Sequence, residues 1–405
     1  MGKNKKKKKE KWVKKRHSFI RFLLIIFVLP IIKLIYGFKC KKMKIKKGEK
    51  YIVLANHQAT LDPVFVGAGF SKPLYFVAND DLLHLNFLSK LLTYCFGIIG
   101  KSKGKSDFMT VKTMLQVLKE NGSVCVFPEG NRTFSGDLCY INPAITKFVK
   151  SAKTPVVLYN IEGGYGADPR WSLKKRKGHF VGYVKRILSV EELANMTLEE
   201  VHQTIIDELN VQDAPSKYEY KSKQSAERIE RVLYICPECN AKHELVSNGN
   251  TFTCKACGST WEYTQNLTIT KDNELYKFPT VSKWYNYQLE DIRNYDYTSD
   301  EYIFYDNDVL LYASVDHAPK EVIKGGEIVL FNSELHVQDL VFKLEEIEGV
   351  AASGKQQVIF RVGNIVYTIQ NNKELRNDFN ALKYVLVINY IKSQIHTKGE
   401  EFFGI

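Results

Sequence analysis

The sequence predicts an α/β domain, built as a layered sheet with flanking helices, followed by a zinc-binding module and a small antiparallel β domain with a C-terminal helix. Three patterns support this prediction. Short apolar runs alternate with helical patterns up to about residue 215, two Cys-x-x-Cys pairs follow, and strand-like runs separated by turns begin near residue 301. With 405 residues, 44% of them hydrophobic, the chain can bury the cores of two or three domains.

The α/β prediction depends on apolar runs of strand length with helical patterns between them. Residues 106–122 place apolar side chains three and four positions apart and end at Gly122, which predicts a helix. Thr197 and Glu200 have the spacing of a capping box, which predicts a further helix that ends near residue 209. Strands are expected at residues 50–55, 123–127, 154–161 and 179–188.

The positive charge of the chain is concentrated in its first 50 residues. The formal net charge is +13, and residues 1–50 contain 19 Lys or Arg against Glu10 and Glu49, a local charge of +17. Residues 51–405 therefore carry about −4, the difference between +13 and +17. A nucleic-acid-binding protein usually carries its positive patch on the folded domain, so this distribution argues against nucleic acid and favours an anionic membrane surface.

An apolar run, residues 22–32, lies inside the basic region. No small-residue cleavage site follows it, so a secretory signal peptide is not expected. A crossing helix of roughly 20 residues would have to include Arg21 and Lys33, and Pro30 can kink it. Because lysine clusters flank both ends, we expect a segment held in one leaflet at the cytoplasmic face of the cell membrane. A single crossing helix and a soluble core helix are the alternatives.

The cysteines fall into two groups. Cys40, Cys95, Cys125 and Cys139 are scattered singly, as incidental thiols are. The other four form two Cys-x-x-Cys pairs separated by 14 residues, the spacing of a zinc ribbon; they are Cys236, Cys239, Cys254 and Cys257. Disulfides are the alternative, but without a secretion signal a reducing compartment is expected. Four thiolates leave no open position on Zn²⁺, so the predicted metal is structural.

Two polar stretches follow the first two predicted strands, where an α/β fold collects its chemistry. "NHQATLD" contains His57 and Asp62, and "FPEGNRTFSG" begins at Phe127. Asp62 and Pro63 also suit the start of a helix, as a capping carboxylate followed by proline. On that simpler interpretation His57 is an ordinary loop residue.

Together the two stretches resemble the signature blocks of the glycerolipid acyltransferases, which include the 1-acylglycerol-3-phosphate acyltransferases. The matching positions are His57, Asp62, Phe127, Pro128, Glu129, Gly130 and Arg132, and the resemblance covers about residues 20–215. It implies that His57 is the general base for the acceptor hydroxyl and that Asp62 orients and supports the imidazole. It also implies that Glu129, Gly130 and Arg132 shape the acceptor site, with Arg132 pairing to phosphate.

The resemblance further implies the substrates. The donor is acyl-CoA or acyl carrier protein, and the acceptor is a lysophospholipid, with 1-acylglycerol-3-phosphate giving phosphatidic acid as the leading expectation. Between the two blocks the family usually carries an arginine, whereas this chain has Lys101, Lys103 and Lys105. We expect Lys101 to bind phosphate as a point charge; a solvated basic turn is the alternative. A non-enzymatic zinc-ribbon scaffold, or a nucleic-acid-binding protein with a vestigial acyltransferase domain, is the alternative function.

The last 140 or so residues have a weaker pattern. Strand-like runs from Glu301 onward precede an apolar helical stripe made by Leu375, Phe379, Leu382 and Leu386. This arrangement resembles a pleckstrin-homology or GRAM type of domain. The expected units are a basic arm at 1–17, a membrane-associated segment at 18–40, the acyltransferase domain at 41–215, a linker at 216–231, the zinc ribbon at 232–265, and the β-rich domain at 266–405.

Overall fold

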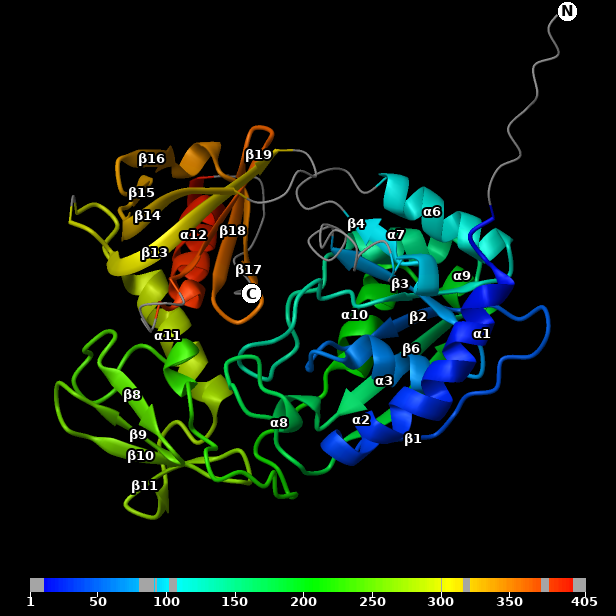
Figure 1. The fold of residues 1–405 in the computed structure, drawn as a ribbon, viewed down its shortest axis with the longest axis horizontal. Coiled ribbons are helices and arrows are strands. Elements are labelled where there is room, and N and C mark those ends of the chain that lie inside the picture. Colours follow the sequence, from blue (N-terminus) through cyan, green and yellow to red (C-terminus); the bar gives the residue numbers. More distant parts are fainter. Residues whose placement is uncertain are drawn as a thin grey trace, which may run out of the picture.

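The chain folds around three sheets that lie side by side (Figure 1). The computed structural model describes residues 11–79, 91–101 apart from Leu92, 108–299, 301–315, 321–372 and 379–395; of Asn79 and Lys101 it describes only the backbone. The N-terminal sheet and its helices form one half of the molecule. The two antiparallel sheets form the other half, with helix α11 (Val281–Asn294) between them.

The N-terminal sheet is mixed and has seven strands in the order β1-β7-β6-β2-β5-β3-β4. All of its pairs are parallel except β6 with β7. Its strands are β1 (Lys39–Cys40), β2 (Ile52–Ala55), β3 (Leu74–Asn79), β4 (Ile99–Lys101), β5 (Ser123–Val126), β6 (Val156–Glu162) and β7 (Val181–Leu188). The four strands expected from the sequence are confirmed as β2, β5, β6 and β7, whereas β1, β3 and β4 were not expected.

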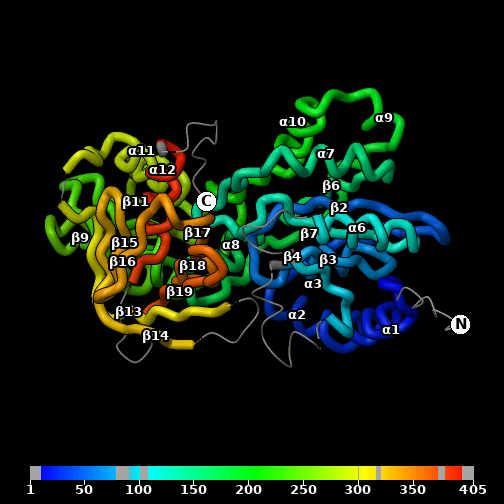
Figure 2. The backbone as a smooth tube through the Cα atoms, turned by 90° about the horizontal axis from the view of Figure 1, so that it is seen from above, coloured from blue at the N-terminus to red at the C-terminus, as the bar shows by residue number. Residues whose placement is uncertain are grey.

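Helices cover both faces of this sheet because its central strands are apolar throughout. In β2, Ile52 and Leu54 point into one core cluster, and Val53 and Ala55 point into the other. The first cluster is covered by α6 (Phe108–Lys119), α7 (Ala144–Ser151), α9 (Val190–Asn195) and α10 (Leu198–Leu209). The second is covered by α3 (Asp62–Ala68) and the N-terminal helix, and Figure 2 shows the two groups on opposite sides. The short α8 spans Gly164–Ala167.

Two expected helices are present within this domain. Helix α6 begins at Phe108 within the expected range of 106–122. Helix α10 begins after Thr197, whose side chain accepts the Glu200 N–H while Glu200 bonds back to the Thr197 N–H. The predicted capping box is therefore confirmed.

The apolar N-terminal segment is one continuous helix that lies along the surface of the first domain (Figures 1 and 2). It comprises α1 (Lys15–Leu23), a π-helical turn (Leu24–Val28) and α2 (Leu29–Tyr36). Leu29 and Tyr36 are buried against the domain, but Phe27 and Leu34 are 65% and 74% exposed. These exposed apolar side chains argue against the alternative that the segment is a helix buried in the core of a soluble protein. Among the described residues it is the single helix long and apolar enough to cross a membrane.

The cysteine pairs lie in an antiparallel sheet of order β12-β11-β10-β9-β8. Its strands are β8 (Leu245–Asn248), β9 (Thr251–Cys254), β10 (Thr260–Tyr263), β11 (Ile269–Lys271) and β12 (Glu274–Leu275). The sheet therefore continues past residue 265, where the sequence placed the boundary. The preceding segment, expected as a linker at 216–231, packs into the protein: Tyr220, Ala226 and Ile229 are buried, and Ile229–Arg231 form a 3₁₀ turn.

The C-terminal domain is a seven-stranded antiparallel sheet of order β16-β15-β14-β13-β19-β18-β17. Its strands are β13 (Phe304–Val315), β14 (Glu321–Leu330), β15 (Glu334–Val337), β16 (Leu340–Lys343), β17 (Glu348–Ser353), β18 (Gln357–Val362) and β19 (Ile365–Asn371). A 3₁₀ turn, Leu344–Glu346, precedes β17, and helix α12 (Ala381–Ile395) packs on β17 and β18. Phe379, Leu382 and Leu386 are buried as expected, and Leu375 lies outside the described residues. The pleckstrin-homology or GRAM likeness stays a prediction.

Helix α11 packs against the cysteine-bearing sheet through a buried contact and against α12 of the C-terminal domain. Trp284 packs against Trp261 and Phe252 of the cysteine-bearing sheet, and its indole N–H donates to the Ile235 carbonyl. The Gln288 side chain accepts the N–H of Tyr234 and donates to the Val232 carbonyl. Because the oxygen and the nitrogen of this amide both have partners in an apolar core, the contact fixes the position of α11 against residues 232–235.

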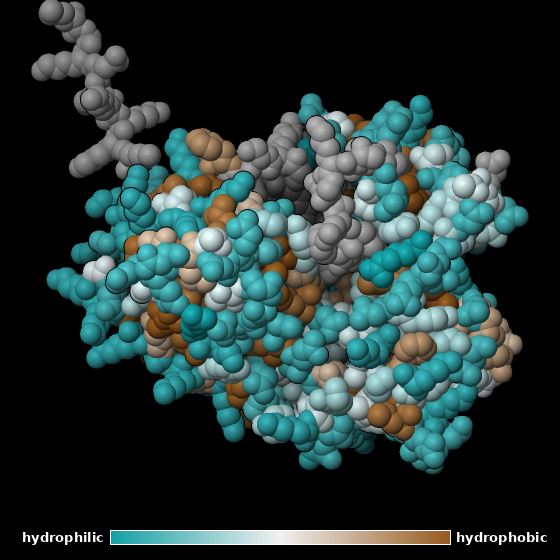
Figure 3. Space-filling view, turned by 180° about the vertical axis from the view of Figure 1, so that it is seen from behind, coloured by the Kyte–Doolittle hydropathy of each residue, from teal (hydrophilic) through white to brown (hydrophobic). Residues whose placement is uncertain are grey.

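The face seen in Figure 3 is mainly hydrophilic, with hydrophobic residues in small groups.

Candidate active site

The two signature segments meet because their strands are neighbours. Strands β2 and β5 pair in parallel, with Leu54 opposite Val126, so the segments that follow them leave the same edge of the sheet. The His57 N–H donates to Glu129 Oε1 at 2.6 Å, and the Thr133 N–H donates to the His57 carbonyl at 3.3 Å. These bonds hold the first segment against the second over a separation of about 70 residues.

His57 has one ring nitrogen bonded and the other directed to a cavity. Nδ1 lies 2.9 Å from Asp62 Oδ2, so the bonded tautomer donates from Nδ1 and leaves Nε2 as the basic nitrogen. The ring stacks on Phe127 with 4.4 Å between centroids, which fixes its plane. The side chain is 19% exposed, and it lines a cavity of about 930 Å³.

Asp62 does not act as the helix cap that its sequence suggests. It is the first residue of α3, and the residue at the cap position, Leu61, has no side-chain cap. The fully buried carboxylate turns back into the preceding loop, where Oδ2 also accepts the N–H groups of Gln58 at 2.7 Å and Ala59 at 2.8 Å. Its place in the first turn still favours the negative charge through the helix dipole.

Glu129 is partly buried beneath the site and does not line the cavity. Besides the His57 N–H, its carboxylate accepts the Cys139 N–H at 2.8 Å. Burial raises the pKa of Glu129 to about 8, and the two N–H donors offset only part of that effect. Glu129 therefore ties together the loops that carry His57 and Arg132.

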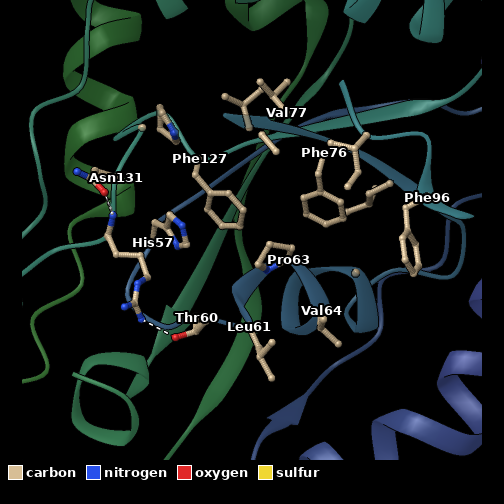
Figure 4. Close-up of a pocket in the computed structure, with 18 of the residues that line it drawn as sticks. His57, Thr60, Leu61, Pro63, Val64, Phe76, Val77, Phe96, Phe127 and Asn131 are labelled. Atoms are coloured by element: carbon tan, nitrogen blue, oxygen red, sulfur yellow. Dashed lines mark hydrogen bonds between the residues drawn. The ribbon is translucent and has the colours of Figure 1, made fainter. Parts of the chain in front are cut away.

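Arg132 lies beside His57 at the polar end of the cavity. Its guanidinium donates to Thr60 Oγ1 at 2.8 Å, the bond drawn as a dashed line at Thr60 in Figure 4. It also lies 3.7 Å from Asp168 Oδ2, while the Thr60 N–H and hydroxyl both donate to Asp168. The side chain is 12% exposed. Gly130 has φ +68 and open space where a side chain would stand, so the backbone borders the cavity there.

The cavity holds about 930 Å³ and separates polar from apolar lining. Figure 4 shows Asn131 and Thr60 on one side of His57, and Phe76 and Phe96 on the other. The apolar part extends to the inner side of the N-terminal helix, where Ile25 and Leu29 line it. A reacting group at His57 would therefore have a polar neighbour on one side and a long apolar channel on the other.

Several lining residues were not expected from the sequence. Thr60 and Arg170 come from the loops after β2 and β6, and residues 352–354 come from the C-terminal domain. Asp168, also after β6, does not line the cavity but holds Thr60 and Arg132 from behind. The stretch "ADPR" follows the third predicted strand, so the strand-end rule could have marked Asp168 and Arg170. Nothing in the sequence could have indicated a contribution from residues 352–354. Lys101 ends β4, and its side chain lies outside the described residues, as do Lys103 and Lys105.

The four cysteines of the second sheet come together as a cluster. Their Sγ atoms lie within 4.8 Å of one another, with 3.8 Å from Cys236 to Cys257 and 3.7 Å from Cys239 to Cys254. A disulfide needs about 2.05 Å. Four sulfurs at about 2.3 Å from one Zn²⁺ in a tetrahedron would lie about 3.8 Å apart. The thiols therefore lie close enough to bind one metal ion, and their spacing fits zinc.

The fold and the site define an acyltransferase domain. Residues 38–161 match the protein-family model described as Acyltransferase, so this part of the chain is an acyltransferase-family domain. A protein of Mycoplasma genitalium named "Probable 1-acyl-sn-glycerol-3-phosphate acyltransferase" is 29% identical over 171 residues, which are 40% of this chain and 62% of that protein. The 1-acyl-sn-glycerol-3-phosphate acyltransferase of Borreliella burgdorferi is 29% identical over 121 residues, 29% of this chain and 48% of that protein.

These relatives match less than half of this chain. The chain spans about three fifths of the length of the first Mycoplasma relatives, 62% and 61%. A crystal structure of a 1-acyl-sn-glycerophosphate acyltransferase from Thermotoga maritima matches with a TM-score of 0.39 and 18% identity, over 47% of this chain and 77% of that one.

Proposed function

We propose that the protein transfers an acyl chain from a thioester to the free hydroxyl of a lysophospholipid, with 1-acylglycerol-3-phosphate as acceptor and phosphatidic acid as product. The observation that carries the proposal is the placement of His57 between Arg132 and an apolar channel, with Asp62 behind the imidazole. The names of the curated relatives support the same reaction.

His57 acts as the general base. Nε2 takes the proton of the acceptor hydroxyl while the oxygen attacks the thioester carbonyl, and the resulting imidazolium gives that proton to the leaving thiolate. One C–O bond forms, one C–S bond breaks, and the products are an ester and a thiol. Asp62 stabilises the imidazolium through Nδ1, so no covalent enzyme intermediate is needed.

The acceptor phosphate binds at Arg132. Thr60 and Asp168 hold the guanidinium in place, and a planar fork suits phosphate oxygens. Gly130 keeps the neighbouring backbone open, and Glu129 positions the loop from below. Lys101 adds positive charge near the same edge of the sheet as a point-charge partner for phosphate.

The acyl chains lie in the apolar channel, which leads toward the N-terminal helix. That helix turns the side chains of Phe19, Phe27 and Leu34 outward, so it inserts in the plane of one leaflet at the cytoplasmic face while Ile25 and Leu29 line the channel. The lysines around it add about 1 kcal/mol of attraction each near an anionic surface. Lipid acceptor and product can then exchange with the membrane without crossing water.

The remaining parts have supporting roles. The four cysteines hold one structural Zn²⁺. The acyl donor is acyl-CoA or acyl carrier protein.

A non-enzymatic scaffold would not require an imidazole paired with a carboxylate inside a cavity of about 930 Å³. The arrangement of His57 and Asp62 therefore favours the enzyme over the scaffold.

The proposal is tested by thiol release from acyl-CoA in mixed micelles, with 1-acylglycerol-3-phosphate or monoacylglycerol as acceptor. Wild type is expected to release thiol only when an acceptor is present, and His57→Ala is expected to lose this activity while staying folded. Arg132→Ala should raise KM for the phosphate-bearing acceptor and spare monoacylglycerol. Lys147→Ala, at an exposed lysine on α7, is the control. Near-normal turnover in His57→Ala would contradict the mechanism.

A further inference from the structure

A hairpin of the C-terminal domain reaches into the candidate active site. Strands β17 and β18 lie at the side of their sheet that faces α8 of the first domain (Figures 1 and 2). The turn between them, residues 354–356, follows Ala352 and Ser353, and residues 352–354 line the same cavity as His57. The cavity is therefore closed at its polar end by a domain far away in the sequence.

The hairpin is bonded to the segment that carries Arg132. The Asn131 side chain donates to the Ala352 carbonyl at 3.2 Å, and the Arg170 guanidinium donates to the same carbonyl at 3.0 Å. Arg170 also donates to the Gly354 carbonyl at 2.9 Å and to the Arg132 carbonyl at 2.7 Å. One buried guanidinium thus joins the phosphate-binding segment to the hairpin tip.

Positive charge exceeds negative charge around this junction. Lys355, at the hairpin turn, donates to the Ser172 carbonyl and lies within electrostatic range of Arg132, Arg231 and Lys175 and of the Asp168 carboxylate. Burial and the neighbouring Arg132 lower the pKa of Arg170 to about 9, and burial lowers the pKa of Lys355. Arg170 is buried and donates to three backbone carbonyl oxygens, and among the described residues it forms no ion pair, so an anion beside it would be favoured.

We propose that the tip of the β17–β18 hairpin, residues 352–354, is the outer wall of the acceptor headgroup site and selects a phosphate monoester over lysolipids with an extended headgroup. The proposal rests on the proposed function and adds the source of its acceptor selectivity. Lys355 is a positioning and selectivity residue in it, because it anchors the turn and adds charge beside Arg132.

The selectivity for a monoester is expected because the headgroups differ both in size and in charge. A monoester phosphate carries close to two negative charges and ends at the phosphorus, so it can face Arg132 with the hairpin backbone behind it. A phosphodiester carries one negative charge and a further group, which would have to occupy the position of residues 352–354. A choline or ethanolamine group would also place a cation among Arg132, Arg170 and Lys355.

The test compares acceptor selectivity in the full-length protein. Turnover with acyl-CoA is measured in mixed micelles for 1-acylglycerol-3-phosphate and for the matched lysophosphatidylcholine and lysophosphatidylglycerol, in wild type, Lys355→Glu and Lys355→Met. Lys343→Glu is the matched control, because Lys343 is an exposed lysine at the end of β16, at the opposite edge of the same sheet from β17. Near-ultraviolet circular dichroism checks that each variant is folded, and Lys355→Met decides the outcome where Lys355→Glu does not fold.

We expect wild type to prefer 1-acylglycerol-3-phosphate, and each Lys355 variant to lose about tenfold of that preference through KM, with kcat largely kept. Lys343→Glu should keep the wild-type ratio. An unchanged ratio in folded Lys355→Met, or an equal loss in Lys343→Glu, overturns the proposal while leaving the acyl transfer intact. Absence of thiol release with every lysolipid in wild type would instead overturn the proposed function, and this inference with it.

Discussion

The Nδ1 atom of His57 lies 2.9 Å from Oδ2 of Asp62, and the same oxygen accepts two backbone N–H groups from Gln58 and Ala59. A single carboxylate oxygen therefore shapes the loop and orients the imidazole. The two roles separate cleanly, because the side-chain oxygen of asparagine can accept the same three hydrogen bonds but carries no charge.

Asp62→Asn should keep the fold and lose most of the activity. Without the negative charge the imidazolium formed during the reaction is no longer stabilised, and kcat should fall by two or more orders of magnitude. Lysolipid-dependent thiol release and thermal unfolding are measured on the same preparations. A fall in activity matched by unfolding, or activity within about threefold of wild type, would contradict this role for Asp62.

Glu129 should make stability depend on pH in a defined direction. Burial raises the pKa of Glu129 from 4.5 to about 8, so between these values the folded state holds a proton that the unfolded state has lost. The protonated Glu129 side chain therefore contributes most to the free energy of unfolding below about pH 4.5. This contribution decreases as the pH rises and is lost above about pH 8. Glu129→Gln removes this dependence.

The measurement is chemical denaturation of wild type and Glu129→Gln at several pH values between 5 and 8. The stability of the variant relative to wild type should rise with pH, since only wild type must ionise a buried carboxyl group. A relative stability that falls over this window would mean that the two N–H donors keep Glu129 ionised in the folded protein.

The cysteine cluster should bind one zinc per chain, and its loss should loosen the contact around α11. Cys254 ends β9 and lies in the core cluster that also contains Trp284, so Cys254→Ser should expose that core to proteolysis before it changes turnover at His57. Metal content and limited proteolysis are the readouts. Cys40→Ser is the control, and zinc retained after loss of two of the four cysteines would reject the assignment.

The exposed face of the N-terminal helix should govern membrane association. Deletion of residues 1–38 would also remove the buried Leu29 and Tyr36, so a sharper change is Phe19, Phe27 and Leu34 to serine together. This change should weaken binding to anionic vesicles and leave thermal unfolding unchanged, because these side chains make little contact with the domain.

Protease protection tests the in-plane orientation separately. The basic arm, residues 1–16, and residues 41–50 are expected on the same side of the membrane. Opposite sides would mean that the helix crosses, and the one-leaflet proposal would then be wrong.

The sequence by itself determined the parts whose signals are local. Apolar runs and capping residues predicted β2, β5, β6, β7 and α10, because strand and helix periodicity is set by neighbours along the chain. Its signature motifs predicted that His57 and Asp62 act together, and cysteine spacing predicted the four-thiol cluster.

Tertiary structure alone decided how distant segments complete the site. Asp62 was expected to cap α3 but turns back to Gln58 and Ala59, since the cap and the loop compete for the same carboxylate and only the folded loop shows which donors reach it. Arg170 meets residues 352–354 through backbone carbonyl oxygens, which every residue type carries. A contact made by carbonyl groups leaves no mark in the side-chain pattern, so its existence depends on how the two domains pack.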